Sequence, residues 1–377
     1  MSSGNVLNVL LWSPKGAGGH YYGPGTNAYN MYSEMVRRKN MNVVLVHSCD
    51  EQEDRDAYCE VVKLEGGYHS WGWGLLLYVF RSFSLLWRYR DRGYVFHGLD
   101  VYSPIFIPAI IAKLLGYSVC LKAAAAPTGF TSSKNSILLF LRRIFANQMD
   151  LYFVISEEIY EELKGVGISE EKLILTYNGV DHRRFKPSSS YPCNGSADRK
   201  LSLLFTGALC RRKRPHLLLE AMSFAESRAL WRVIFVGPFQ EEDYLVELKE
   251  LSQCIGMKDD VKFEGYQREL GDYYSNADVY GLPSLSEGMP NGVLEAMSCG
   301  LPIVISSFSS SRLLCDGSNG FIANTSQEFA AALDRLAFDG SVRGGMGMRS
   351  RMLVESKFSM QSVGDLYYES FVKLLAR

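Results

Sequence analysis

The sequence predicts an α/β protein made of two Rossmann-like domains, each built on a doubly wound parallel sheet. Short apolar runs alternate with amphipathic segments along the whole chain, as expected for repeated strand and helix units. The 377 residues exceed what one hydrophobic core usually holds and favour two domains of roughly 150 to 200 residues each. A polar stretch with Pro and Gly at 187–196 marks a boundary. We therefore place the first domain at 1–187, the second at 198–358 and a final helix at 359–377.

The expected strands are apolar runs separated by helical segments. In the first domain they are 6–12, 43–46, 95–97, 118–121 and 151–155. In the second domain they are 201–205, 233–237, 261–265, 279–282 and 303–305. Helices are expected at about 26–38, at 216–222 and at 359–375. This alternation is typical of a parallel sheet covered by helices.

Composition places the chain among globular proteins and argues against nucleic-acid binding, zinc sites, disulfide bonds and membrane spans. Hydrophobic residues make up 47% and the formal net charge is -1, so the chain as a whole has no attraction to nucleic acid. The eight cysteines are scattered singly, which indicates neither a zinc site nor a disulfide framework and favours a reducing cytoplasm. Residues 1–12 do not read as a secretory signal, and the longest apolar stretch, 105–115, is shorter than a membrane span.

The segment 68–94 combines aromatic and basic residues. Leu76, Phe80, Phe83 and Trp87 recur at helical spacing, while arginines such as Arg88 gather on another face. Such a helix can lie on an anionic membrane surface, or it can be an ordinary core-facing helix with a solvated side. The sequence leaves both interpretations open, and the segment 137–145 repeats the ambiguity.

A helix start near residue 290 is the most informative feature of the chain. The predicted strand 279–282 ends at a proline, Pro290 suits the first turn of a helix, and Gly300 closes it. The free amides and positive dipole of such a helix start form an anion site. The residues that would line this site are Gly288, Met289, Pro290, Asn291, Gly292 and Val293.

Two carboxylates flank that helix start. Glu287 precedes it and Glu295 lies about one turn inside it, with seven residues between them. Because carboxylates repel phosphates, we expect them to accept hydrogen bonds from hydroxyl groups on either side of a diphosphate. Ribose at one end and a hexose at the other describe a nucleotide sugar.

Two loops could contribute further groups to this site. The loop after 201–205 carries four adjacent cations, Arg211 to Arg214, which predict a phosphate site. The glycine-rich turn after 6–12 contains Gly18 and Gly19, which would allow backbone to approach a ligand or would simply form a tight turn.

A dinucleotide fingerprint offers a different interpretation. The sequence Gly-Pro-Gly-Thr-Asn-Ala at 23–28 satisfies the permissive pattern of NAD-binding proteins. About ten residues separate it from the preceding strand, whereas the fingerprint should follow the strand directly. An NAD-dependent oxidoreductase is therefore a minor alternative.

The pattern Pro-Ser-x-x-Glu-Gly-x-Pro-Asn, with its second Glu, resembles the donor site of the retaining family-four glycosyltransferases, known as glycosyl transferases group 1. The resemblance implies a GT-B fold, with two Rossmann-like domains facing a central cleft. The first domain would bind the acceptor and the second the nucleotide sugar, and the last helix would pack back across both.

The resemblance also assigns roles to individual residues. Glu287 would lie by the donor sugar as a catalytic residue, and Glu295 would hold the ribose. Lys213, the second catalytic candidate, would contact the diphosphate with help from Arg212. In addition, Gly18 and Gly19 would face the diphosphate, and Tyr266 would lie near the base.

The sequence departs from the family pattern at two places. Ala208 stands where the family has an Arg, and no His follows the strand 118–121. Lys122 or His97 could occupy the place of that His on the acceptor side, although a His at a strand end is commonly structural.

The expected function is the transfer, with retention, of a hexosyl group from a UDP- or GDP-linked sugar to a glycan or lipid-linked glycan, in surface polysaccharide or lipopolysaccharide assembly. The second half contains no Asp-x-Asp, so neither a metal nor another cofactor is expected. The alternative is a non-catalytic subunit that binds nucleotide sugar. We expect a cytoplasmic protein that could lie at the inner face of the cell membrane and bind no nucleic acid.

Overall fold

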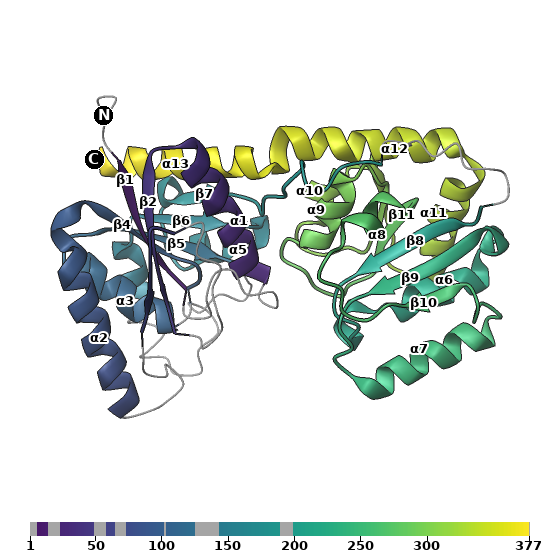
Figure 1. Ribbon diagram of the computed structural model, residues 1–377, viewed down its shortest axis with the longest axis horizontal. Coiled ribbons are helices and arrows are strands. Elements are labelled where there is room, and N and C mark those ends of the chain that lie inside the picture. Colours follow the sequence, from purple (N-terminus) through teal and green to yellow (C-terminus); the bar gives the residue numbers. More distant parts are fainter. Residues whose placement is uncertain are drawn as a thin grey trace. The chain divides into compact units, whose positions relative to one another are not determined.

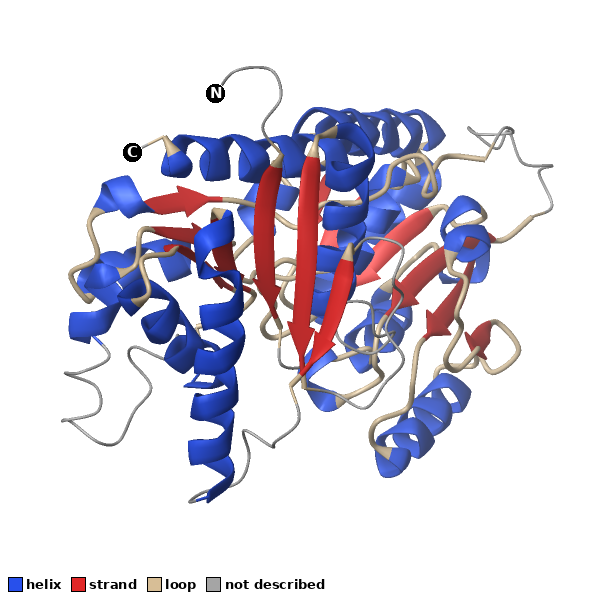
Figure 2. Cartoon of the chain, turned by 60° about the vertical axis from the view of Figure 1, so that its left-hand side comes forward, coloured by secondary structure: helices blue, strands red, loops and turns tan. Residues whose placement is uncertain are grey.

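The computed structural model describes residues 6–13, 23–48, 58–64, 73–101, 103–124, 143–188 and 199–376 (Figures 1 and 2). The chain forms two compact units, Met1–Gly179 with Met360–Arg377, and Val180–Ser359. It therefore enters the second unit just before the polar stretch at 187–196 and returns to the first unit for its last helix.

The first unit is built on a parallel sheet of seven strands in the order β3-β2-β1-β4-β5-β6-β7. Its strands are β1 (Leu7–Trp12), β2 (Met41–His47), β3 (Glu60–Lys63), β4 (Tyr94–Gly98), β5 (Ser118–Ala123), β6 (Leu151–Val154) and β7 (Leu173–Leu175). Its helices are α1 (Gly23–Arg38), α2 (Trp73–Tyr89), η1 (Arg90–Arg92), α3 (Ser103–Leu114), α5 (Glu157–Gly165), η2 (Glu170–Lys172) and α13 (Met360–Leu375). Strand order reverses direction between β1 and β4.

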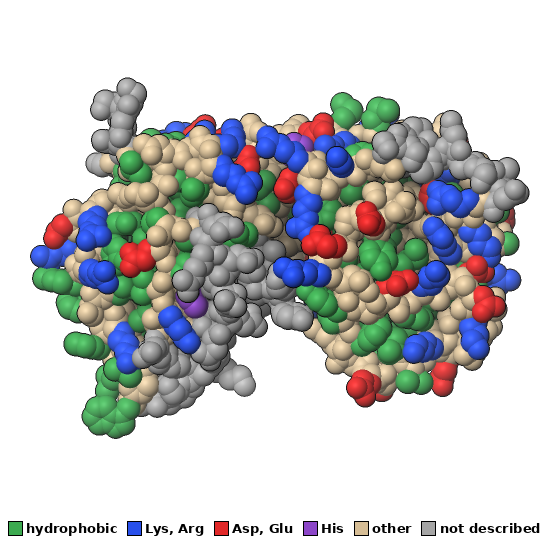
Figure 3. Space-filling view, viewed as in Figure 1, with side chains coloured by type: hydrophobic (Ala, Val, Ile, Leu, Met, Phe, Trp, Pro, Cys, Tyr) green, Lys and Arg blue, Asp and Glu red, His purple; other side chains and the backbone are tan. Residues whose placement is uncertain are grey.

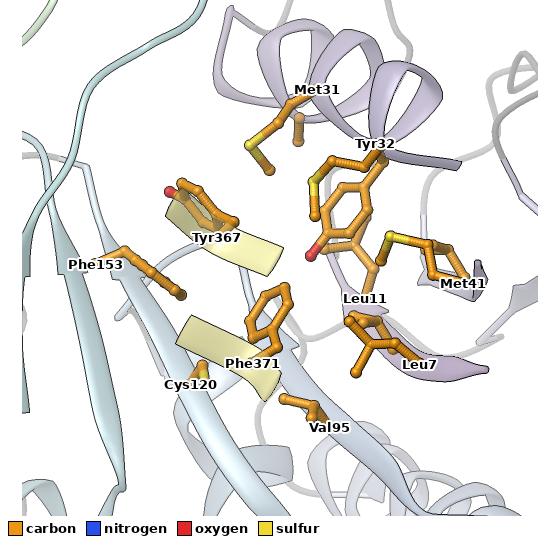
Figure 4. Packing of buried hydrophobic residues seen from close by; sticks show 14 of the residues in the cluster. Leu7, Leu11, Met31, Tyr32, Met41, Val95, Cys120, Phe153, Tyr367 and Phe371 are labelled. Atoms are coloured by element: carbon orange, nitrogen blue, oxygen red, sulfur yellow. The ribbon is translucent and has the colours of Figure 1, made fainter. Parts of the chain in front are cut away.

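Different helices cover the two faces of this sheet. Neighbouring residues of a strand point to opposite faces, so each of them contacts a different set of helices. Leu7 and Leu11 of β1 belong to a buried cluster with Tyr32 of α1 and with Tyr367 and Phe371 of α13 (Figure 4). On the other face, the indole of the neighbouring residue Trp12 donates a hydrogen bond to the hydroxyl of Tyr78 in α2 over 3.2 Å. Helix α3 packs beside α2.

The second unit is built on a parallel sheet of six strands in the order β10-β9-β8-β11-β12-β13. Its strands are β8 (Leu201–Thr206), β9 (Trp231–Val236), β10 (Val261–Phe263), β11 (Val279–Leu282), β12 (Ile303–Ile305) and β13 (Gly320–Ile322). Its helices are η3 (Arg211–Lys213), α6 (His216–Phe224), η4 (Arg228–Leu230), α7 (Glu242–Cys254), α8 (Gly271–Ser275), α9 (Asn291–Ser298), α10 (Ser311–Leu314), α11 (Ser326–Phe338), α12 (Gly340–Leu353) and η5 (Val354–Phe358).

This topology confirms the predicted fold class, α/β with two Rossmann-like doubly wound sheets. In the second unit the strand order runs outward from β8 in one direction and from β11 in the other. A ligand of such a sheet binds at the carboxyl ends of the strands where the order reverses. For the second unit that point lies between β8 and β11.

Candidate functional site

Two loops meet at the switch point of the second unit. One follows β8 and contains η3, and the other follows β11 and leads into α9. The Leu285 amide donates to the Arg212 carbonyl over 2.9 Å, and Arg214 Nε donates to the Pro283 carbonyl over 2.8 Å. Arg214 adopts a left-handed backbone conformation with φ 48°, which is unusual for a residue with a side chain. One backbone hydrogen bond and one hydrogen bond from the Arg214 side chain thus fix the two loops against each other.

The four adjacent cations of the first loop do not act as one cluster. Arg211 turns toward α7 and donates to Glu247 over 2.6 Å, and Arg214 is used on the backbone of the second loop. Only Arg212 and Lys213 face Glu287. The tight turn of η3 directs successive side chains to different sides, so the predicted phosphate site retains two cations.

Glu287 is the centre of the contacts between the loops. Its Oε1 accepts hydrogen bonds from Lys213 Nζ over 2.8 Å, from Ser284 Oγ over 3.0 Å and from Arg212 Nη1 over 3.2 Å. Among the described residues, nothing donates to its Oε2. The side chain is 13% exposed, and the protein's hydrogen bonds to its carboxylate are all made to Oε1 within the described part of the chain.

Lys213 lies directly over the end of β8. A Cβ placed on Gly207 would come 3.3 Å from both Cε and Nζ of Lys213, and Gly207 itself has φ 130°. An ammonium group has three N–H donors, and the bond to Glu287 uses one of them. Two donors of Lys213 are therefore left for an anion at the switch point.

The amino end of α9 lies beside the same strand end. Helix α9 begins at Asn291, with Pro290 as its N-terminal cap residue. The side chains of Met289, Pro290 and Val293 are buried and Gly288 is partly buried, so this stretch can offer mainly backbone groups to a ligand.

Gly292 allows α9 to approach β8 closely. A Cβ at Gly292 would come within 2.6 Å of both Thr206 Oγ1 and the Tyr280 hydroxyl. Because any larger residue would meet these hydroxyl groups, Gly292 allows the start of α9 to lie close to Thr206 at the end of β8.

Glu295 belongs to a chain of hydroxyl groups under α9. Its Oε2 accepts a 2.7 Å hydrogen bond from the Tyr274 hydroxyl, which lies 2.7 Å from Thr206 Oγ1. Burial raises the pKa of Glu295 to about 7, although the Tyr274 hydrogen bond and the charge of Arg184 oppose this shift. Among the described residues Glu295 Oε1 has no hydrogen-bond partner, so it can accept from a ligand hydroxyl.

Among the other predicted donor residues, one follows β10 and two lie outside the described part. Tyr266 follows the end of β10 and is 42% exposed. Gly18 and Gly19 lie outside the described residues.

Both acceptor-side candidates belong to the first unit and are buried. His97 is fully buried in β4, where its Nδ1 lies 2.6 Å from the Tyr32 hydroxyl, and burial together with the charge of Lys122 lowers its pKa to about 3. Phe153 and Tyr367 pack against its ring, so His97 lies in the core of the first unit, and its role on the acceptor side stays a prediction.

Lys122 lies at the carboxyl end of β5 and is 3% exposed. Its Nζ donates to Asn178 Oδ1 over 3.3 Å, and burial lowers its pKa to about 8. Its role on the acceptor side stays a prediction.

Sequence reasoning missed the hydroxyl groups that position the two carboxylates. The contact of Ser284 could have been predicted, because a Ser three residues before Glu287 in a turn is placed to donate a hydrogen bond to its carboxylate. Tyr274 and Thr206 have no comparable signal, because they come from different elements and meet Glu295 only through the fold.

In the described ranges no group of His, Cys, Asp and Glu side chains is arranged to hold a metal ion. The chain's Asp-x-Asp sequence, Asp54-Arg55-Asp56, lies outside those ranges. No helix in the described part combines the length and the apolarity needed to cross a bilayer.

Comparison with known proteins finds similarities that include the residues of this site. Residues 200–339 match the family model described as Glycosyl transferases group 1. The lipopolysaccharide core biosynthesis glycosyltransferase LpsE of Rhizobium meliloti is 26% identical over 166 residues, which are 43% of this chain and 47% of LpsE. The D-inositol 3-phosphate glycosyltransferase of an Arthrobacter species is 31% identical over 205 residues, or 51% of this chain and 48% of the relative. The chain thus spans about half the length of these curated relatives.

Solved structures resemble the whole chain. HepE of Anabaena in complex with UDP matches with a TM-score of 0.78 at 18% identity, over 98% of this chain and 100% of HepE. The lipopolysaccharide outer core galactosyltransferase WaaB matches with a TM-score of 0.71 at 17% identity, over 97% of this chain and 99% of WaaB. These likenesses establish the predicted GT-B fold. Both loops of the site lie within residues 200–339, the part of the chain that matches the glycosyl transferases group 1 model.

Proposed function

We propose that this protein is a retaining glycosyltransferase that moves a hexosyl group from a UDP- or GDP-linked sugar to a glycan or lipid-linked glycan. The observation that carries the proposal is the meeting of Lys213, Glu287 and the start of α9 at the switch point of the second unit. A diphosphate between the ammonium and the helix start would be contacted by two N–H donors of Lys213 and by first-turn amides.

The two carboxylates support the same orientation of the donor. Glu287 Oε2 and Glu295 Oε1 have no donor among the described residues, so each can accept from a hydroxyl of the ligand. We assign Glu287 to the hexose and Glu295 to the ribose. Tyr266, at the end of β10, is the candidate for the base, and Arg212 assists Lys213.

The proposed reaction needs no covalent enzyme intermediate. The bond between the anomeric carbon and the phosphate oxygen breaks, and its electron pair leaves with the nucleoside diphosphate. An acceptor hydroxyl oxygen then bonds to the anomeric carbon on the same face, and its proton passes to the departing diphosphate. Lys213 and Arg212 stabilise the negative charge that develops there, a kind of electrostatic stabilisation that contributes strongly to catalysis in many enzymes.

The donor and acceptor classes are supported by relatives. HepE was solved with UDP, and a further HepE structure contains UDP-glucose. LpsE is named for lipopolysaccharide core synthesis, and WbnH of Escherichia coli is named for O-antigen synthesis. We therefore place the acceptor among cell-surface polysaccharides or lipopolysaccharides, at the cytoplasmic side of the membrane.

A panel of nucleotide sugars tests the proposal. A ligand at 100 times its dissociation constant adds about 2.7 kcal/mol to the free energy of unfolding, so the correct donor should raise the melting temperature of the protein. Release of nucleoside diphosphate with a chelator present would then establish turnover without a metal, and NMR of the product would give its anomeric configuration. Donor binding without any turnover, over a wide screen of acceptors, would favour the non-catalytic subunit; no binding of any nucleotide sugar would refute both.

A further inference from the structure

Helix α2 has two apolar stripes on opposite sides. Tyr78, Leu85, Leu86 and Tyr89 are buried, together with Ser82. A second set is exposed at the spacing of a separate helical face, formed by Trp73, Leu76, Leu77, Phe80, Phe83 and Trp87. With 3.6 residues per turn the two sets point in opposite directions. One stripe is therefore used by the fold, and the other is left on the surface.

The buried stripe fixes α2 to the first unit. Tyr78 accepts the hydrogen bond of Trp12, and the carbonyl of Leu86 accepts a 2.7 Å hydrogen bond from the Tyr117 hydroxyl. The Tyr89 hydroxyl donates to Glu60 over 2.6 Å. The exposed stripe consequently belongs to a rigid, docked helix and does not need the helix to detach.

The exposed stripe is unusually large for a protein surface. Its six side chains are between 42% and 88% exposed, and it extends for about 21 Å from Trp73 to Trp87 at 1.5 Å per residue. Its four aromatic side chains alone leave roughly 500 Å² in contact with water. This is near the upper end for the largest apolar patch of a monomeric protein, which points to a binding surface. Hydrophobic side chains gather over α2 in the space-filling view (Figure 3).

Arginines border this stripe, and acidic residues are nearly absent. Arg88, Arg90 and Arg92 are exposed at the end of α2 and in η1, and Asp91 is the sole acid between residues 73 and 92. Arg90 lies 3.4 Å above the Trp87 ring and pairs with Asp91. Among the residues that the structure describes, no carboxylate forms an ion pair with Arg88 or Arg92.

We propose that the exposed stripe of α2 docks the first unit on an anionic lipid membrane. Trp, Phe and Leu would enter the boundary between headgroups and acyl chains, and the bordering arginines would contact lipid phosphates. A second copy fits less well, since a symmetric contact through this stripe would bring two arginine borders together with little acid to offset them. This inference concerns the surface of the first unit and holds whatever group the second unit transfers.

Vesicle sedimentation tests the proposal with matched variants. The apolar pair Leu76→Gln with Phe80→Gln removes two exposed side chains of the stripe, and Gln preserves helix propensity. Its control is Phe338→Gln with Met348→Gln, which removes two equally exposed apolar side chains from the second unit. The basic pair Arg88→Gln with Arg92→Gln is matched by Lys249→Gln with Lys258→Gln, two exposed lysines of the second unit. Melting temperatures would show that every variant is folded.

The expected results differ for each variant and lipid. Wild-type protein should bind vesicles containing phosphatidylglycerol better than vesicles of phosphatidylcholine alone, and added salt should weaken this binding. The apolar and basic pairs should each weaken binding at least about thirtyfold, while both controls bind as wild type. Absence of wild-type binding would overturn the proposal, as would an equal loss in the controls. Self-association that the apolar pair abolishes, without vesicle binding, would assign the stripe to a second copy.

Discussion

Replacing Lys213 by Ala is the sharpest test of the donor site. The substitution removes the ammonium group that lies 2.8 Å from Glu287 Oε1 and directly over Gly207. Glu287 keeps its hydrogen bonds from Ser284 and Arg212, so the carboxylate is not left without a partner. The loops also keep the backbone bond from Leu285 to Arg212. We therefore expect a folded protein that has lost one positive charge at the diphosphate.

The size of the effect follows from electrostatics. Two unit charges about 4 Å apart interact with about 4 kcal/mol at an effective dielectric constant of 20. The diphosphate of the bound donor is already negatively charged before the reaction. Only the increase in its attraction to Lys213 as the diphosphate departs therefore lowers the barrier. A loss of about 2.7 kcal/mol, which is typical of removing one preorganised donor, corresponds to at least about a hundredfold lower turnover.

Release of nucleoside diphosphate from the donor identified by thermal shift provides the assay. Arg211→Ala is the matched control, since Arg211 is two positions away in the same loop but pairs with Glu247 of α7. This variant should remain within about threefold of wild type, because surface ion pairs contribute little. A Lys213→Ala protein with near-normal turnover, or an Arg211→Ala protein that is equally impaired, would refute the assignment.

Three further substitutions probe the same site. Glu287→Ala should also lower turnover at least about a hundredfold, and an unchanged rate would remove Glu287 from the donor site. Burial holds the pKa of Glu295 at about 7 against an ordinary 4.5, so the native state binds the proton more tightly and stability should fall as pH rises from about 4.5 to about 7. Because the carboxylate is partly exposed, the free energy of unfolding should fall by only about 1 to 2 kcal/mol over this pH range. Glu295→Gln should abolish this pH dependence when unfolding by urea is measured. An identical dependence of stability on pH in both proteins would contradict the raised pKa. Gly292→Ala should destabilise the protein by about 1 to 3 kcal/mol, because its Cβ would meet Thr206 and Tyr280. Its control is Gly345→Ala in α12, which has open space around it and should be neutral or stabilise the helix by up to about 1 kcal/mol. Similar melting temperatures for the two variants would show that the contact at Gly292 is not tight.

The fold and the location of the site were predictable because they depend on local patterns. Apolar runs alternating with helical segments predict parallel strands, and the structure contains all ten expected runs as strands. The Glu, seven residues, Glu spacing spans one helix start and therefore fixes where the two carboxylates lie relative to α9. The helix at about 26–38 was predicted three residues short, since α1 begins at Gly23.

The remaining features depend on which groups the fold brings together. The environment of Glu295 comes from Tyr274, in a helix 21 positions earlier in the chain, and from Thr206 in β8. Periodicity also could not decide the orientation of α2, because apolar residues lie on both of its sides and only packing shows that Tyr78 faces the core.

In the two loops, the atoms that hold the loops together differ from the atoms that are proposed to contact the donor. The Leu285 amide and the Arg214 side chain donate to backbone carbonyls across the loops, and the Ser309 hydroxyl donates to the Glu287 carbonyl over 2.9 Å. The groups that would meet the donor are different atoms: the ammonium of Lys213 and Oε2 of Glu287. Removing these side-chain atoms leaves the bonds of Leu285, Arg214 and Ser309 in place. A slow variant with an unchanged melting temperature would therefore report on charge at the diphosphate rather than on a displaced loop.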